Sequence, residues 1–174
     1  MPIRGVISLP GDKSISHRAL MLATLTDGNC AIHNISTGED VETTRKCLVQ
    51  CGIESEKYKT TVQLRGGDLK PTEMPLYCGN SGTTVRLMAG LLAGKGVQAK
   101  FTGDKSLSER PMNRIIDPLT KMGVIIESEN GHLPLLLTSD KLSGINYSQP
   151  ISSAQVKSCI ILAGLGAFGV TKIK

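Results

Sequence analysis

An acid, a cation and a hydroxyl follow a Pro-Gly pair within a few positions at residues 10–20, Pro-Gly-Asp-Lys-Ser-Ile-Ser-His-Arg-Ala-Leu. Asp12 is a candidate helix cap, and Lys13 and Ser14 would follow it in the first helical turn. Arg18 comes four residues after Ser14, so on a helix it projects from the same face. The first turn of a helix carries free N–H groups and the positive end of the helix dipole. This segment is therefore interpreted as a cradle for an anion.

The chain repeats this arrangement with a period near 70 residues. Residues 18–28 align with residues 86–96, an offset of 68, and residues 47–53 align with residues 118–124, an offset of 71. A third unit opens at residues 152–157. This period is too long for the common solenoid repeats, so each unit is predicted to be a small α/β subdomain.

In each later unit, anion-binding candidates stand at the start of the first helix. They are Asn80, Gly82, Thr83 and Arg86 in the second unit, and Ser153 and Gln155 in the third. Such residues are also ordinary helix caps, so one helix of this kind would prove little. Three in register, with Gly82 permitting a close backbone approach, favour a site where helix N-termini converge on one small ligand.

The composition points to small acidic ligands. The chain has 174 residues, a net charge of +5, no basic run and only 3% aromatic residues. A nucleic-acid surface would show clustered basic residues and stacking aromatics, so no nucleic-acid partner is expected. No signal peptide or membrane span is recognised, because the apolar run at residues 159–170 is short and interrupted by glycine.

The five cysteines form no Cys-x-x-Cys pair, and no histidine stands near Cys47 and Cys51 to complete a metal site. An odd number of cysteines suggests reduced thiols. We therefore expect a cytoplasmic protein that holds no metal.

Hydrophobic periodicity predicts an α/β fold of repeated βαβαββ subdomains, with helices packed on mixed sheets. The first unit is expected to comprise a strand at residues 3–9, a helix at 14–25, a strand at 30–35, a helix at 39–51 and strands at 53–57 and 61–64. The second is expected to comprise helices at 82–93 and 112–122 and strands at 98–102, 124–128 and 133–137. Completing the third unit, which has one helix and a strand at 170–174, would take roughly 45 further residues, so it is predicted to be truncated.

Four motifs occur in order, at residues 9–18, 79–86, 103–111 and 153–157. Together they resemble the N-terminal part of the 5-enolpyruvylshikimate-3-phosphate synthase family, across essentially the whole chain. The resemblance implies two globular halves, each of three βαβαββ repeats, that close over the substrates. It further implies that residues 1–12 belong to the other half, which is largely absent here. Residues 13–174 would form the substrate-binding half, with repeats at about 13–67 and 79–140 and the start of a third at 151–174.

The resemblance implies transfer of the enolpyruvyl group from phosphoenolpyruvate to the 5-hydroxyl of shikimate 3-phosphate in the shikimate pathway, with release of phosphate. Both substrates carry phosphate and carboxylate groups, so fixed cations and hydrogen-bond donors are needed and no cofactor is implied. Glyphosate is implied as an inhibitor. The acid and base carboxylates of the family lie in the missing C-terminal half, so this chain alone is not expected to turn over.

The resemblance also assigns residues to each substrate, with Lys13 bridging both as the catalytic candidate. The shikimate 3-phosphate set is Lys13, Ser14, Arg18, Ser153 and Gln155. The phosphoenolpyruvate set is Lys13, Asn80, Gly82, Thr83, Arg86, Arg110 and Gln155. Ala154 stands where the family often has a second serine, so any contact there must come from the backbone.

Two alternatives remain open. The sister transferase that acts on UDP-N-acetylglucosamine shares the fold, but it carries Lys-Asn at the positions of Lys13 and Ser14. A non-catalytic ligand-binding module is the second. The Gly-Asp-Lys-Ser sequence recurs at residues 103–106, outside the repeat register, and is interpreted as a chance likeness on a solvated turn. His17 is interpreted as a packed or capping residue rather than a base.

Overall fold

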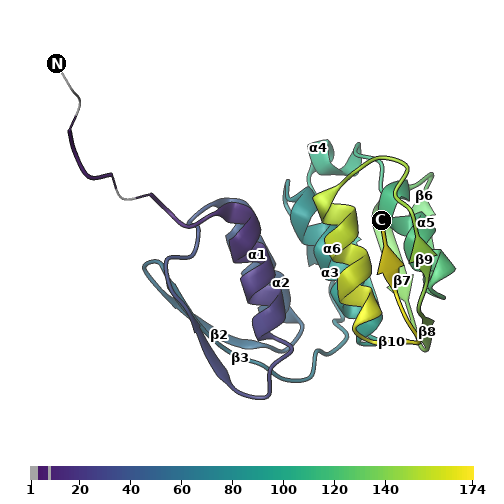
Figure 1. Cartoon of the computed structure of the whole chain (residues 1–174), viewed down its shortest axis with the longest axis horizontal. Coiled ribbons are helices and arrows are strands. Elements are labelled where there is room, and N and C mark those ends of the chain that lie inside the picture. Colours follow the sequence, from purple (N-terminus) through teal and green to yellow (C-terminus); the bar gives the residue numbers. More distant parts are fainter. Residues whose placement is uncertain (1–3, 8) are drawn as a thin grey trace.

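A computed structural model of the chain describes residues 4–7 and 9–174 (Figure 1). Its elements follow in this order: α1 (Lys13–Ala23), β1 (Asn29–Ile32), α2 (Glu39–Gln50), β2 (Glu54–Tyr58), β3 (Thr61–Arg65), β4 (Leu76–Tyr77), α3 (Gly82–Gly94), β5 (Ala99–Thr102), α4 (Lys105–Ser108), α5 (Asn113–Lys121), β6 (Ile125–Glu129), β7 (His132–Thr138), β8 (Leu142–Ser143), β9 (Asn146–Tyr147), α6 (Ala154–Gly164), β10 (Ala167–Phe168) and β11 (Lys172–Ile173).

The first group of elements is an antiparallel sheet in the order β1-β3-β2, against which α1 and α2 pack. In β3 the side chains alternate, so that Val62 and Leu64 are buried while their neighbours face solvent. They meet Leu20 and Met21 of α1 and Leu48 of α2 within one apolar core. The helical and strand periods in the sequence thus place one apolar face of each element against the others.

The second group is a four-stranded sheet in the order β4-β5-β7-β6, covered by α3 and α5. In β7, within the strand predicted at residues 133–137, the buried side chains of Leu133, Leu135 and Leu137 alternate with more exposed positions, so that one face of the strand lies in the core. Nearly every residue of α3 is buried, because this helix lies between its own sheet and α6. It is the central element of the molecule (Figure 1).

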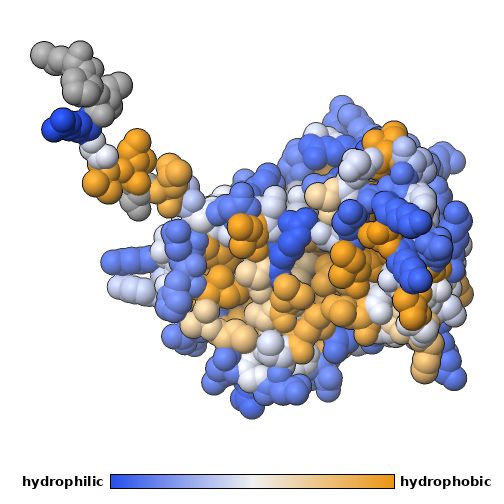
Figure 2. Space-filling view, in the orientation of Figure 1, coloured by the Kyte–Doolittle hydropathy of each residue, from blue (hydrophilic) through white to orange (hydrophobic). Residues whose placement is uncertain are grey.

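Two glycines let α3 and α6 approach closely. A Cβ atom at Gly90 would overlap the carbonyl oxygen of Cys159, and one at Gly94 would lie 2.7 Å from the carbonyl oxygen of Leu162. Helices α1 and α6 also carry exposed apolar side chains, among them Leu22 of α1 and Ile161 of α6. Figure 2 shows apolar residues gathered on the face where these two helices lie.

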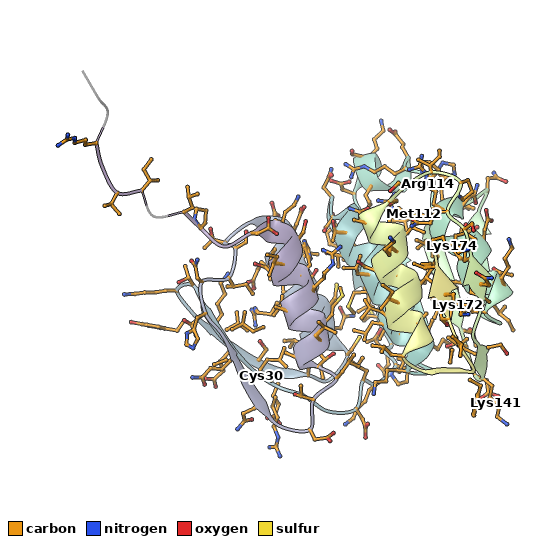
Figure 3. All side chains as sticks on the ribbon, viewed as in Figure 1. Cys30, Met112, Arg114, Lys141, Lys172 and Lys174 are labelled. Carbon is orange, nitrogen blue, oxygen red and sulfur yellow. The ribbon has the colours of Figure 1, made fainter. Side chains whose placement is uncertain are left out.

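The mixed α/β fold expected from the sequence is confirmed, and the longer helices begin and end within about two residues of their predicted bounds. The short elements α4, β4, β8, β9 and β10 were not predicted. The five cysteines form no disulfide within the described chain, and Cys30 on β1 is the least buried of them (Figure 3). No helix in the described part of the chain is long and apolar enough to span a membrane.

The strand expected at residues 3–9 is not formed at residues 4–7 and 9, and residues 3 and 8 lie outside the described part. Val6, Ile7 and Leu9 are exposed on a segment that runs away from the body (Figure 1). A strand needs a neighbour for its backbone hydrogen bonds, and the described residues offer this segment none. Its assignment to another half stays a prediction.

The contact between α3 and α6 predicts the effect of a single methyl group. On helix propensity alone, Gly90→Ala would stabilise the protein by about 1 kcal/mol. Because the new Cβ would strike the backbone of Cys159, we expect it instead to lower the free energy of unfolding by about 1–3 kcal/mol. Urea unfolding gives the sign. Gly28→Ala is the control, since a Cβ there meets nothing within 4 Å. A stabilised Gly90→Ala variant would contradict the close approach.

Candidate functional site

Helix α1 begins as the sequence predicted. The carboxylate of Asp12 accepts a hydrogen bond of 2.7 Å from the backbone N–H of Ile15, which caps the helix. Lys13 follows, with its side chain 57% exposed, and its Nζ pairs with the carboxylate of Asp40 on α2 at 2.9 Å. The ammonium at this helix start therefore has a carboxylate partner and remains accessible to solvent.

Helix α3 begins at a second cap. The Ser81 hydroxyl accepts a hydrogen bond of 3.2 Å from the N–H of Thr84, and Gly82 is the first helical residue. A Cβ at Gly82 would lie 2.8 Å from a guanidinium nitrogen of Arg86 and 3.6 Å from one of Arg110. The absence of a side chain at Gly82 thus lets two arginines converge over the start of this helix.

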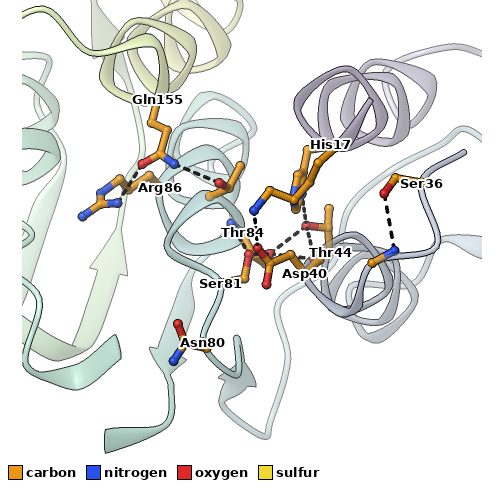
Figure 4. Close-up of polar contacts among 12 residues, drawn as sticks. His17, Ser36, Asp40, Thr44, Asn80, Ser81, Thr84, Arg86 and Gln155 are labelled. Carbon is orange, nitrogen blue, oxygen red and sulfur yellow. Dashed lines mark hydrogen bonds and ion pairs between the residues drawn. The ribbon is translucent and has the colours of Figure 1, made fainter. Parts of the chain in front are cut away.

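Helix α6 begins at the Ser153 cap, whose hydroxyl accepts from the N–H of Val156 at 3.4 Å. The amide of Gln155 joins α6 to α3, as Figure 4 shows. Its Oε1 accepts from Arg86 at 2.7 Å, and its Nε2 donates to the Thr83 hydroxyl at 2.9 Å. The second and third predicted helix starts are therefore in direct contact.

Arg18 connects α1 with α6. Its guanidinium donates to the hydroxyl of Ser158 at 3.1 and 2.8 Å, to the carbonyl of Ser14 at 2.9 Å and to the carbonyl of Ala154 at 3.4 Å. The last contact uses the backbone of the residue that lacks a hydroxyl. All three predicted helix starts are thus joined through side chains.

The three arginines of the site share an electrostatic property. Within the described residues, the ion pairs are Lys13–Asp40, Arg45–Glu42 and Lys57–Glu42. Arg18, Arg86 and Arg110 instead donate to neutral carbonyl, amide and hydroxyl oxygens. Burial lowers the pKa of Arg86 from its usual value, and the positive charges of Arg110 and Arg114 lower it further. An anion bound between these crowded positive charges would offset the repulsion among them.

A buried line of polar side chains connects α1, α2 and α3 (Figure 4). His17 Nδ1 lies 2.7 Å from the Thr44 hydroxyl, which lies 2.8 Å from the Thr84 hydroxyl. Thr84 donates to the Ser81 hydroxyl at 2.7 Å. His17 is fully buried, so the interpretation of a packed histidine is confirmed.

The structure brings most of the predicted site residues together. A connected set lies at the starts of α3 and α6 and in the loops beside them: Asn80, Gly82, Thr83, Arg86, Arg110 and Gln155. Arg18 joins this set through α6, and Ser153 caps that helix. Lys13 and Ser14 lie at the start of α1, where Lys13 contacts Asp40. The substrate roles of these residues stay predictions.

Sequence reasoning did not single out three polar partners of the site, Asp40, Ser158 and Asp104. Ser158 stands four residues after Ala154, a spacing that would place both on the face toward α1. The interpretation of residues 103–106 as a chance likeness on a solvated turn stays a prediction, and Lys105 and Ser106 are exposed. Asp104 accepts a hydrogen bond of 3.0 Å from the Asn80 side chain and therefore contributes to the site.

Comparisons with known proteins all point to one family. A family model for EPSP synthase (3-phosphoshikimate 1-carboxyvinyltransferase) matches residues 1–174. Curated 3-phosphoshikimate 1-carboxyvinyltransferases from Koribacter versatilis and Vesicomyosocius okutanii are 45% and 47% identical, each over 98% of this chain. A solved structure of EPSP synthase from Acinetobacter baumannii has a TM-score of 0.93 and 41% identity over 98% of this chain.

These relatives are longer proteins. The chain spans 41% and 40% of the two curated relatives and 40% of the Acinetobacter baumannii chain. The similarity therefore covers one continuous part of each.

The buried histidine predicts how stability depends on pH. The pKa of His17 lies at about 4 instead of 6.5, chiefly because of burial; the charge of Asp40 opposes this shift, and those of Lys13 and Arg18 add to it. Between pH 6.5 and 4 the unfolded chain therefore binds a proton that the folded chain does not. We expect the free energy of unfolding to fall by about 3 kcal/mol across this interval because of His17.

The measurement is urea unfolding between pH 7.5 and 5, above the range in which most carboxylates titrate. His17→Asn provides the control, because an amide can still hydrogen-bond to Thr44 but does not titrate. The variant should lose most of the pH slope below about 6.5. The same slope in both proteins would contradict the assignment.

Proposed function

The chain belongs to the EPSP synthase family, and from this membership we propose that it binds phosphoenolpyruvate and shikimate 3-phosphate. The reaction it serves is transfer of the enolpyruvyl group to the 5-hydroxyl of shikimate 3-phosphate, with release of phosphate. The names of the curated relatives favour this reaction over transfer to a UDP-sugar.

One observation carries the proposal. Arg18, Arg86 and Arg110 lie around the joined starts of α1, α3 and α6, and in the described chain none of them forms an ion pair with a carboxylate. Helix N-termini and guanidinium groups both favour phosphate and carboxylate groups. Two substrates that each carry both groups suit this arrangement.

The phosphoenolpyruvate set surrounds the start of α3. Arg86 and Arg110 both approach Gly82, so a small anion held there could accept hydrogen bonds from two planar guanidinium groups. Gln155 keeps Arg86 in place by accepting one of its N–H groups at 2.7 Å. The shikimate 3-phosphate set extends from this point along the starts of α1 and α6.

Lys13 would stand between the two substrates. An ammonium can donate three hydrogen bonds, and Asp40 accepts one of them at 2.9 Å. Two donors remain for the anionic groups of the substrates, and Asp40 fixes the direction from which they approach. In this role Lys13 offsets negative charge as the leaving phosphate forms.

We propose that residues 13–174 provide substrate binding and that turnover needs groups found elsewhere in the longer relatives, of which this chain spans about 40%. The described site offers cations and hydrogen-bond donors at the arginine cluster. Asp40 is paired with Lys13, and Asp104 is occupied by N–H donors, so neither carboxylate is poised as an acid or a base.

Binding gives the first test. Calorimetric or NMR titration of the chain with shikimate 3-phosphate should show weak, saturable binding that falls with ionic strength, because exposed charges are screened. Arg18→Lys keeps the charge but loses the planar fork, so we expect binding to weaken by about 1–3 kcal/mol.

Arg65→Lys is the matched control, because Arg65 is exposed on β3 in the first sheet and lies outside the site. No saturable binding at millimolar ligand in a folded sample would contradict the proposal. Equal weakening by Arg18→Lys and Arg65→Lys would contradict the assigned role of Arg18.

Gly82 gives the second test, in an enzyme made by joining residues 1–174 to the C-terminal half of a family member. Gly82→Ala would place a methyl group 2.8 Å from Arg86 and 3.6 Å from Arg110. Because this crowds the anion pocket, glyphosate inhibition should weaken more than the affinity for the smaller phosphoenolpyruvate.

Inhibition constants and KM values for the parent and Gly82→Ala give the comparison. Gly67→Ala should change neither quantity, since a Cβ there meets nothing within 4 Å. Unchanged glyphosate inhibition in the Gly82→Ala enzyme would mean that Gly82 does not line the pocket.

A further inference from the structure

The short helix α4 holds a carboxylate beside the start of α3. Asp104 precedes the helix, and its Oδ1 accepts from the N–H of Leu107 at 2.8 Å. The Leu107 side chain is fully buried, which anchors the turn to the core. A Cβ at Gly103 would lie 3.0 Å from the carbonyl oxygen of Gly79, so this turn also packs tightly on the loop before α3.

Asp104 makes two further contacts with that loop. Its backbone N–H donates to the carbonyl of Gly79 at 2.9 Å, and its Oδ2 accepts from Asn80 Nδ2 at 3.0 Å. The two carboxylate oxygens therefore have separate partners, one in the helix and one in the loop. A surface helix cap would need only the contact with the N–H of Leu107.

The opposite end of the Asn80 side chain faces Arg110. Asn80 Oδ1 accepts from the Arg110 guanidinium, which also donates to the backbone carbonyl of Asn80 at 3.4 Å and to the Ser106 hydroxyl at 3.3 Å. An ionised carboxylate can only accept hydrogen bonds, and a guanidinium can only donate them. The amide between them has one satisfactory orientation, and the contact with Asp104 sets it.

We propose that Asp104 is a positioning residue that fixes the Asn80 amide and, through it, the Arg110 guanidinium beside Gly82. The inference rests on the proposed function insofar as phosphoenolpyruvate is the anion that Arg110 would meet. It gives Asp104, which lies outside the sequence repeat, a role in the site.

A carboxylate suits this position because each of its oxygens accepts from an N–H donor. The N–H of Leu107 and the amide of Asn80 lower the pKa of Asp104 from its usual value, so it stays ionised near neutral pH. Asp104 forms no ion pair with Arg110 within the described chain. The neutral amide of Asn80 thus orients the Arg110 guanidinium without neutralising it. The positive charge of Arg110 therefore stays available to a ligand.

Asp104→Asn separates capping from positioning. The new side chain can still cap α4 through its carbonyl oxygen, but it presents an NH2 group where Asn80 needs an acceptor. The Asn80 amide must then rotate or move, and the contact with Arg110 becomes donor against donor. We expect a shift of the Asn80 side-chain NH2 signals and broadening of the Arg110 guanidinium signals in NMR spectra of the ligand-free chain.

Affinity provides the functional readout. Because a charge-assisted contact is weakened, Asp104→Asn should raise the Kd for phosphoenolpyruvate roughly tenfold. Lys105→Ala is the matched control on the same turn and should leave the affinity and both sets of signals unchanged. Asp104→Ser, which can cap α4 without reaching Asn80, should behave like Asp104→Asn and provides a second variant if the first fails to fold.

An exchange of the two partners tests the orientation directly. In the double variant Asp104→Asn with Asn80→Asp, the carboxylate at position 80 can accept from both the NH2 group at position 104 and the Arg110 guanidinium. Every donor then has an acceptor again. The Arg110 signals should sharpen again, which a purely structural effect of losing Asp104 would not produce.

Unchanged Asn80 and Arg110 signals in folded Asp104→Asn would overturn the proposal, as would failure of the double variant to restore the Arg110 signals. If these signals change as expected but the parent does not bind phosphoenolpyruvate, the positioning role stands and the proposed function fails.

Discussion

The close packing of α3 against α6 is the contact on which the rest of the site depends. Glycine at positions 90 and 94 brings the α3 backbone against the carbonyl oxygens of α6. At this separation the amide of Gln155 reaches both Arg86 and Thr83 on the neighbouring helix. Larger residues would push the helices apart and remove the bridge. A packing constraint in the apolar core therefore determines whether two helix N-termini can share one ligand.

The arginine cluster opposes folding to some degree, because like charges repel and Arg86 is partly buried. Neutral acceptors such as Gln155, Asn80 and Ser158 satisfy the N–H groups without cancelling the charge. A carboxylate partner would give a more stable empty protein, but the ligand would then have to displace it. The observed arrangement keeps the guanidinium groups ordered while their attraction for an anion is retained.

Local features of the fold could be predicted from the sequence, and contacts between distant residues could not. The Asp12 cap was predictable because its partner, Ile15, is three residues away. By contrast, Lys13 and Asp40 are 27 residues apart, and Asn80 and Asp104 are 24 apart. These pairs depend on how helices and loops pack, and single-sequence periodicity carries no information about that packing. The strand expected at residues 3–9 is not formed at residues 4–7 and 9 for a related reason, because an alternating pattern cannot supply a neighbouring strand.

The hydrogen bonds in the buried line of polar side chains from His17 to Ser81 can all be donated in one direction. We infer that His17 carries its proton on Nδ1, because each hydroxyl can then donate once to the next: His17 to Thr44, Thr44 to Thr84, and Thr84 to Ser81. Donors aligned in one direction polarise one another. The line ends at Ser81, whose hydroxyl also caps α3 by accepting from the N–H of Thr84. A neutral histidine in α1 is thus linked, through two threonines, to the helix start at which Arg86 and Arg110 converge, while its Nε2 is buried without a hydrogen-bond partner in the described chain.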